Sequence, residues 1–265
     1  MNLISYFNGK YILKKDIYLD VEDLAFTRGY AAYECLRAYG KKLFYFDEHF
    51  LRLSKTLTKL LLPLPKIDLQ SILNNLIEKN PHEDLVFRIY ITGSGSLIIL
   101  SDLPTPPTPT EIKEGVSVMT TPLPRTFHKI KSTNYTSAMV SLNTAKKQNF
   151  YEALYLDTDQ NLLEMTKANF FAIIDGTLFT AKDFVLYGIT RNIVINIAKQ
   201  NSIPLVEGPI HKSLISSFSG AFLTSTTKEI LPITQIDQTP IPKNPLTDRL
   251  LNYFQSFTSP TPVVL

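Results

Sequence analysis

The sequence predicts an α+β fold with two domains, and three observations support this prediction. Candidate strands outnumber candidate crossover helices, which disfavours a doubly wound parallel sheet. Apolar residues make up 44% of the 265 residues and charged residues 19%, a composition typical of chains with a buried core. Four prolines fall between Pro104 and Pro109, and such a run fits neither a central strand nor a helix interior.

We therefore place the domain boundary at this proline-rich segment. The expected division is a small domain over residues 1–103, a stiff interdomain connector over 104–114 and a larger domain over 115–265. Linker composition alone leaves open an irregular surface loop within one domain.

Turn residues and apolar spacing predict the elements of the small domain. Gly93 and Gly95 resemble part of a nucleotide-binding loop, but Ile98 stands where the third glycine belongs, so a turn between strands is expected. The expected elements are hairpins over 6–13 (turn Asn8-Gly9) and 37–46 (turn Gly40-Lys41-Lys42), a helix capped by Asp47 that ends before Pro63, a helix over 68–78, and strands over 85–92 and 97–101.

The larger domain shows the same mixture of patterns. Apolar residues of segment 189–200 recur at helical spacing directly after Gly188. The expected elements are strands over 116–121, 152–157 and 221–224, a hairpin over 170–180 with Asp175-Gly176 as its turn, and helices over 189–200 and 246–254.

Charge and cysteine content narrow the function classes. A net charge of +3 without a block of like charges disfavours nucleic-acid binding and a polybasic membrane anchor. The apolar runs are too short to cross a bilayer, and the first ten residues lack a signal peptide's basic and apolar regions. The single Cys35 excludes an internal disulfide, and no two histidines have zinc-pair spacing, so we expect a cytoplasmic protein without a metal.

Three kinds of chemical group in the sequence could together serve a pyridoxal-phosphate enzyme. Lys131 offers an amine for a Schiff base, and Glu164 a carboxylate that could keep a pyridine nitrogen protonated. The amides after Gly188, with Thr190, offer a phosphate site at a helix N-terminus, which Arg52 could complete. Lysine and glutamate are more often simply solvated, so spacing alone leaves both interpretations open.

The chain also resembles the class IV aminotransferases, the fold type IV pyridoxal-phosphate enzymes, over nearly its whole length. The similar segments follow one another in the family's order: Phe7-Asn-Gly-Lys10, Gly29–Tyr39, Glu48-His-Phe-Leu-Arg-Leu53, Lys131–Tyr135, Gly188-Ile-Thr-Arg191, Phe222–Ile233 and Asn244–Leu251. The resemblance implies a two-domain enzyme with pyridoxal 5′-phosphate at the domain interface, and a homodimer.

The resemblance also implies roles for individual residues. Lys131 would form the Schiff base and shuttle the substrate α-proton, and Glu164 would bind the pyridine nitrogen. The phosphate would be held by Arg52, the Ile189 and Thr190 amides and Thr226, and the phenolic oxygen by Tyr135. Thr226 and Thr227 would bind the substrate carboxylate, and Tyr33, Arg37 and Arg88 its side chain. Tyr33 and Tyr135 as core aromatics, and Arg37 as a surface cation, remain alternatives.

Several activities fit the same anchoring residues. We expect amino-group exchange between an amino acid, branched-chain L- or D-, and a 2-oxo acid. A 4-amino-4-deoxychorismate lyase is the first alternative, since Ala168-Asn169 resembles that enzyme. A non-catalytic scaffold is the second, motivated by Met165 and Lys167, where the family usually has small residues. Tyr30-Ala31, in place of a frequent Asp-Gly pair, also affects the expected substrate pocket.

Overall fold

The computed structural model describes residues 2–122 and 127–258, which divide into two compact units. Unit 1 contains the residues up to Thr105 together with Ile130–Tyr135. Unit 2 contains Pro106–Lys129 and Thr136–Phe257. Each unit combines helices with a sheet, so the α+β prediction is confirmed.

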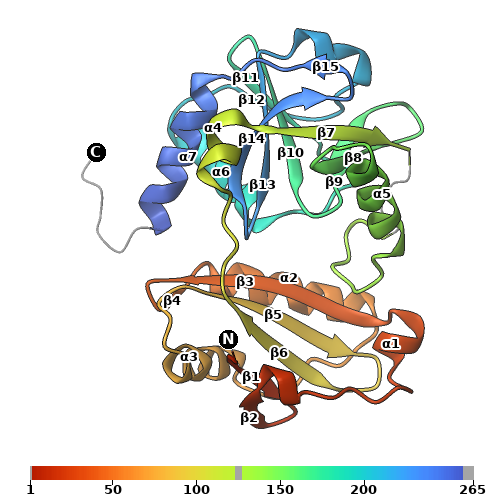
Figure 1. Cartoon of the computed structure of the whole chain (residues 1–265), viewed down its shortest axis with the longest axis vertical. Helices are drawn as coiled ribbons and strands as arrows, with labels where there is room; N and C mark the ends of the chain where they lie inside the picture. The colour runs from red at the N-terminus through yellow and green to blue at the C-terminus, as the bar shows by residue number, and fades with distance from the viewer. Residues whose placement is uncertain (1, 123–126, 259–265) are drawn as a thin grey trace. The chain divides into compact units, whose positions relative to one another are not determined.

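Unit 1 is built on a six-stranded antiparallel sheet with strand order β2-β1-β6-β5-β3-β4 (Figure 1). The expected hairpins at Asn8-Gly9 and Gly40-Lys41 are confirmed as β1–β2 and β3–β4. The elements are β1 (Ile4–Phe7), β2 (Lys10–Leu13), η1 (Lys14–Asp16), α1 (Leu24–Arg28), β3 (Ala31–Tyr39), β4 (Lys42–Leu43), α2 (Phe46–Lys59), α3 (Leu69–Lys79), β5 (Leu85–Thr92) and β6 (Leu97–Asp102).

The core of unit 1 lies between one face of this sheet and the helices α2 and α3. Ala32 and Leu36 of β3 belong to it, together with Leu53 of α2 and Leu73 of α3. Successive strand residues point to opposite faces, so Tyr33 and Cys35 lie on the other, half-buried face.

Several helix boundaries differ from the prediction, including the end of α7, which extends to Thr258 instead of 254, and the start of α2. Helix α2 begins at Phe46 with Tyr45 as its N-cap, so Asp47 lies inside the first turn. Tyr45 has a φ of 51° and provides no side-chain cap. Asp47 and Glu48 still place negative charge in the first turn, where the helix dipole favours it.

Unit 2 contains a nine-stranded mixed sheet with strand order β12-β11-β10-β13-β14-β7-β8-β9, and β15 pairs with β14 (Figure 1). Its elements are α4 (Pro109–Glu114), β7 (Val116–Thr121), α5 (Thr136–Lys147), β8 (Glu152–Leu156), β9 (Leu162–Met165), β10 (Asn169–Ile174), β11 (Thr177–Thr180), α6 (Ile189–Gln200), β12 (Leu205–Glu207), η2 (Lys212–Ser217), β13 (Gly220–Ser225), β14 (Glu229–Ile236), β15 (Thr239–Pro240) and α7 (Pro245–Thr258).

A second pairing, between β9 and β10, closes part of this sheet into a ring of six strands. The side chains inside the ring are apolar, among them Leu154, Met165, Phe170 and Leu223. Neighbouring strand residues therefore face outward, and Glu164 and Asn169 are among them. Both polar residues are therefore held by the paired backbone of the closed ring.

The proline-rich segment is only partly extended. Pro109–Glu114 forms helix α4, which begins with a capping box between Thr108 and Glu111. Pro109 occupies the first turn, where its missing N–H is not needed. The expectation of an extended connector over 104–114 is therefore wrong for its last six residues.

The sequence analysis also missed α5, β9 and β14, whereas it anticipated α6 with its exact bounds. Helix α5 has a weak apolar periodicity, with Ala138, Ser141, Leu142 and Ala145 as its buried residues. In the described part of the chain, no helix is both long and apolar enough to span a bilayer.

Candidate active site

Glu164 lies on strand β9 of unit 2, at an irregular step of the sheet. Leu154 pairs with Met165 and Leu156 with Leu162, so β9 has one residue more than β8 over this stretch. Leu162 and Met165 both pack inside the ring. The bulge therefore turns Glu164 out of the apolar interior, while the residue as a whole remains 3% exposed.

Asn169 connects Glu164 to the segment before helix α6. Its Nδ2 donates to Glu164 Oε2 over 3.2 Å and to the Leu186 carbonyl over 2.7 Å. The Leu186 amide also donates to Glu164 Oε2, over 3.0 Å. Asn169 and Glu164 are register partners, as are Asn169 and Thr224 of β13. The Glu164 carboxylate is thus held in one orientation by two neighbouring segments.

Helix α6 begins immediately after Leu186 and Tyr187. Its N-cap, Gly188, provides no side-chain hydrogen bond to the first helical amides. A Cβ at Gly188 would collide with Asn169 Oδ1, so any larger residue here would force the Asn169 side chain to shift. The amides of Ile189 and Thr190 are therefore available in the arrangement that binds anions at helix N-termini.

The predicted threonines lie in the turn between β13 and β14. Thr226 and Thr227 are half-buried, and the Lys228 amide at the end of the turn donates to Ser225 Oγ over 3.0 Å. Thr224, two residues before Thr226, is the register partner of Asn169. Within unit 2, strand β13 thus leads from the side of Asn169 to the threonine turn.

Lys131 belongs to unit 1, where its segment pairs with the start of β3. Tyr33 N donates to the Lys131 carbonyl over 2.8 Å, and Ala32 and Ser132 form an antiparallel bridge. The Lys131 amide contacts Thr56 Oγ1 at 3.4 Å. Its Nζ lies 5.0 Å from the ring centroid of Tyr33. The backbone of Lys131 is therefore fixed, and its amine lies beside an aromatic ring.

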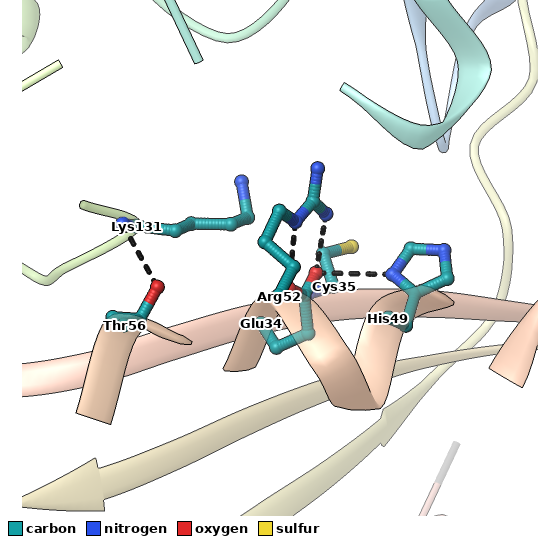
Figure 2. Close-up of polar contacts among 6 residues, drawn as sticks. All are labelled: Glu34, Cys35, His49, Arg52, Thr56 and Lys131. Carbon is teal, nitrogen blue, oxygen red and sulfur yellow. Dashed lines mark hydrogen bonds and ion pairs between the residues drawn. The ribbon is translucent and has the colours of Figure 1, made fainter. Parts of the chain in front are cut away.

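Arg52 lies on α2 and forms a bidentate pair with Glu34 of β3 (Figure 2). Its Nε is 2.9 Å from Glu34 Oε2, and its Nη2 is 2.6 Å from Glu34 Oε1. His49 Nδ1 is 3.1 Å from the same Oε1. Burial by itself raises the pKa of Glu34, but the charge of Arg52 and the hydrogen bond from His49 outweigh it and hold that pKa below its ordinary value.

Three of the five predicted substrate residues, Tyr33, Arg37 and Arg88, share one face of the unit 1 sheet, whereas Thr226 and Thr227 belong to unit 2. Tyr33 faces Tyr90 across β3 and β5, with ring centroids 5.1 Å apart, and Tyr135 packs edge-on against Tyr33. Burial raises the pKa of Tyr33, so its hydroxyl stays protonated at neutral pH. The aromatic rings form a continuous surface near Lys131 Nζ.

The two predicted arginines of this face are paired with carboxylates. Arg88 Nε lies 2.7 Å from Asp102 Oδ2. Arg37 is buried, 3.3 Å from Asp84 Oδ2 and over the ring of Tyr39. The interpretation of Arg37 as an exposed surface cation is therefore wrong.

Two features of these sites were not assigned a role from the sequence. Glu34 lies between Ala32 and Leu36 on an apolar strand face, and a carboxylate there needs partners. That signal could have predicted the contact with His49 and Arg52. Asn169 gave no comparable signal, because its contact with Glu164 depends on the pairing of β9 with β10.

The comparisons with known proteins agree with this geometry. The profile of the family "Amino-transferase class IV" matches residues 31–236. The chain belongs to the class IV aminotransferases. It is 30% identical to a D-alanine aminotransferase of Listeria innocua over 93% of both chains. It is also 30% identical to a putative branched-chain-amino-acid aminotransferase of Methanocaldococcus jannaschii, over 88% of this chain and 87% of that protein.

The fold agrees as well. The branched-chain amino acid aminotransferase of Escherichia coli superposes with a TM-score of 0.87 at 22% identity, over 98% of this chain and 95% of that chain. A branched-chain amino acid aminotransferase solved with pyridoxamine 5′-phosphate superposes with a TM-score of 0.91 at 20% identity, over 99% of this chain and 96% of that chain. Among the interpretations of the sequence, the comparisons support an aminotransferase over a lyase or a scaffold. The chain is thus a pyridoxal-phosphate-dependent aminotransferase.

The described residues fit this cofactor in their chemistry. Unit 2 offers a buried carboxylate, Glu164, and a helix N-terminus whose glycine packs closely against Asn169. Unit 1 offers the Lys131 amine and the Arg52 guanidinium. A carboxylate for a ring nitrogen, an amine for an aldehyde and donors for a phosphate are the groups that pyridoxal phosphate requires.

Proposed function

We propose that this aminotransferase takes the α-amino group from an amino acid with an apolar side chain and transfers it to a 2-oxo acid. The observation that carries the proposal is the aromatic surface beside Lys131 Nζ, formed by Tyr33, Tyr90 and Tyr135. Both neighbouring arginines are already paired with carboxylates, so the surface favours apolar over acidic side chains. Alanine and the branched-chain amino acids have side chains of this kind.

Candidate ligands for the cofactor occur in each of the two units. Glu164, the Ile189 and Thr190 amides and Thr226 come from unit 2, and Arg52, Lys131 and Tyr135 from unit 1. When bound, pyridoxal phosphate supplies an electron-withdrawing ring that stabilises negative charge at the substrate α-carbon. The proposal is supported by the donor set of each unit, since every group needed for ring nitrogen, aldehyde and phosphate is present.

The chain's own residues then have distinct tasks. Lys131 Nζ would move the proton from the substrate α-carbon to the aldehyde-derived carbon of the cofactor, and would move a proton in the reverse direction in the second half-reaction. Glu164 keeps a proton on the ring nitrogen, and Asn169 and the Leu186 amide hold its carboxylate in place. Thr226 and Thr227 bind the substrate carboxylate. Tyr33 excludes water from the substrate side chain by covering it with an aromatic ring.

The test is a half-reaction with single amino donors. The visible absorption of the purified holoenzyme is followed after adding L-leucine, D-alanine, L-glutamate or aminodeoxychorismate. We expect L-leucine or D-alanine to change the spectrum, which also fixes the hand of the donor. A faster response to L-glutamate than to either would contradict the apolar pocket. Pyruvate released from aminodeoxychorismate alone would favour the lyase.

We further propose a cytoplasmic homodimer, as the family resemblance implies. Three apolar side chains before and within α1, those of Tyr18, Val21 and Phe26, are 70–78% exposed on unit 1. These three side chains lie within nine residues of one another in the sequence, and contiguous exposed apolar groups are typical of contact surfaces. Sedimentation equilibrium of the wild type and of Phe26→Ser tests this: a dimer weakened by the substitution is expected, and a monomeric wild type would contradict it.

A further inference from the structure

The buried carboxylate of Glu34 is the centre of a hydrogen-bonded cluster on unit 1 (Figure 2). Its Oε1 contacts Arg52 Nη2 at 2.6 Å, His49 Nδ1 at 3.1 Å and the Cys35 amide at 2.8 Å. Its Oε2 contacts Arg52 Nε at 2.9 Å. Glu34 is 1% exposed and His49 3% exposed. Four donors thus converge on one carboxylate that has almost no contact with solvent.

The positions of these residues in the fold explain why the cluster is rigid. Glu34 lies on the face of β3 that packs against α2, between the core residues Ala32 and Leu36. His49 and Arg52 are three residues apart on α2 and therefore lie on the same side of that helix. The strand and the helix belong to one packed core, so neither partner can shift independently.

The protonation states make the cluster a fixed ion pair with one neutral partner. The nearby Arg52 charge keeps Glu34 ionised by lowering its pKa. Burial lowers the pKa of His49, and the hydrogen bond to Glu34 offsets this only in part. His49 is therefore neutral at neutral pH and acts as a hydrogen-bond donor through Nδ1.

The two hydrogen bonds that Glu34 accepts from Arg52 fix the plane of the guanidinium. They use Nε and Nη2 of Arg52, so the carboxylate occupies one edge of the group. The remaining nitrogen points away from Glu34 (Figure 2). A guanidinium held in this way presents its outer edge in one direction only. Binding a phosphate at that edge then costs less conformational entropy, because the Arg52 rotamer is already fixed.

We propose that Glu34 and His49 are positioning residues that orient Arg52 toward the phosphate of the cofactor. Glu34 sets the plane of the guanidinium, and His49 sets the plane of the Glu34 carboxylate. This inference rests on the proposed role of Arg52 as a phosphate ligand, and it assigns the cluster a function in cofactor affinity beyond fold stability.

The test compares two ligands that differ only in the phosphate. Pyridoxal 5′-phosphate and pyridoxal are titrated into the full chain after removal of its cofactor, and binding is followed by absorption. Glu34→Gln retains the size of the side chain but loses its charge and one strong acceptor. We expect it to weaken pyridoxal 5′-phosphate about tenfold, the loss of one good hydrogen bond, and to leave pyridoxal binding unchanged. Equal weakening of both ligands, or tighter phosphate binding, would overturn the proposal.

Two variants of His49 provide a second test with a smaller change to the cluster than Glu34→Gln. Asparagine carries an N–H donor near the position of Nδ1, whereas leucine carries none. His49→Asn should retain the preference for the phosphorylated ligand, and His49→Leu should lower it. Identical behaviour of the two variants would contradict a donor role, and this pair decides the question if Glu34→Gln does not fold.

Arg52→Gln in the same titrations separates this inference from the proposed function. A selective loss of pyridoxal 5′-phosphate affinity confirms Arg52 as a phosphate ligand. If Arg52→Gln leaves the ratio of the two affinities unchanged, the assignment of Arg52 fails and the positioning proposal fails with it. If wild-type enzyme binds neither ligand, the cofactor assignment itself is wrong.

Discussion

Asn169 Nδ2 lies 3.2 Å from Glu164 Oε2, and the side chain of Asn169 also fills the space beside the backbone of Gly188. One amide side chain thereby fixes both the carboxylate proposed to meet the ring nitrogen and the start of helix α6, where the phosphate is proposed to bind. The two ends of the cofactor are therefore expected to respond to the same substitution.

Gly188→Ala should disturb both the Glu164 carboxylate and the start of helix α6. The new Cβ would collide with Asn169 Oδ1, and Asn169 cannot easily move because it is buried and hydrogen-bonded to Glu164 and Leu186. We expect a loss of about 1–3 kcal/mol in the free energy of unfolding, typical of overpacking, and weaker cofactor binding. Denaturant titration and cofactor titration measure these. The control is Gly208→Ala, because a Cβ there lies 3.8 Å from its nearest neighbour; equal effects of both variants would contradict the argument.

Glu164→Gln should slow the reaction while the cofactor remains bound. Glutamine retains an oxygen that can accept from the Leu186 amide, but it cannot hold a proton on the ring nitrogen by charge. We expect the half-reaction to slow about 10²-fold, typical for loss of one electrostatic group at a reacting centre. Stopped-flow absorption measures the rate. Glu152→Gln removes another buried carboxylate of unit 2, whose partners are Thr166 and Ala153; its rate should remain close to wild type.

Lys131→Ala should abolish turnover, because no other amine is proposed to exchange the α-proton. The measurement is formation of the 2-oxo acid under saturating cofactor. Lys129→Ala is the matched control, since Lys129 is an exposed lysine two residues away in the same segment. Turnover that survives in Lys131→Ala, or disappears in Lys129→Ala, would show that the assigned lysine is wrong.

His49 should make the free energy of unfolding depend on pH near and below its ordinary pKa of 6.5. Its pKa in the folded protein lies below the ordinary value of 6.5, so the unfolded chain binds a proton that the folded protein does not. Falling pH therefore favours unfolding, by at most about 1.4 kcal/mol per pH unit for one group. Chemical denaturation across this range measures the slope. His49→Asn should have a flatter profile than wild type, and His82→Asn serves as the control for loss of one histidine; a steeper slope in His49→Asn would reverse the sign of the argument.

Local patterns in the sequence determined most of the secondary structure and the candidate residues. Asn8-Gly9 and Asp175-Gly176 specified their hairpins because few residues tolerate the backbone angles of such turns. The helix after Gly188 was predictable with its exact ends, since its apolar spacing is regular. The weakly patterned α5 and the short helix α4 were not, because packing and a capping box decide them.

The contacts that orient the candidate residues were decided by tertiary structure. The pairing of β9 with β10 brings Asn169 to Glu164, and the packing of α2 on β3 brings His49 and Arg52 to Glu34. Residue spacing does not predict these contacts. Asn169 meets Glu164 through the pairing of two strands, and His49 and Arg52 meet Glu34 through the packing of a helix on a strand. The sequence by itself therefore identified an amine, a carboxylate and an anion site. The pairing of β9 with β10 and the packing of α2 on β3 decided which neighbouring residues hold these groups. The physical reason is that only a folded core can bury a charge together with its partners.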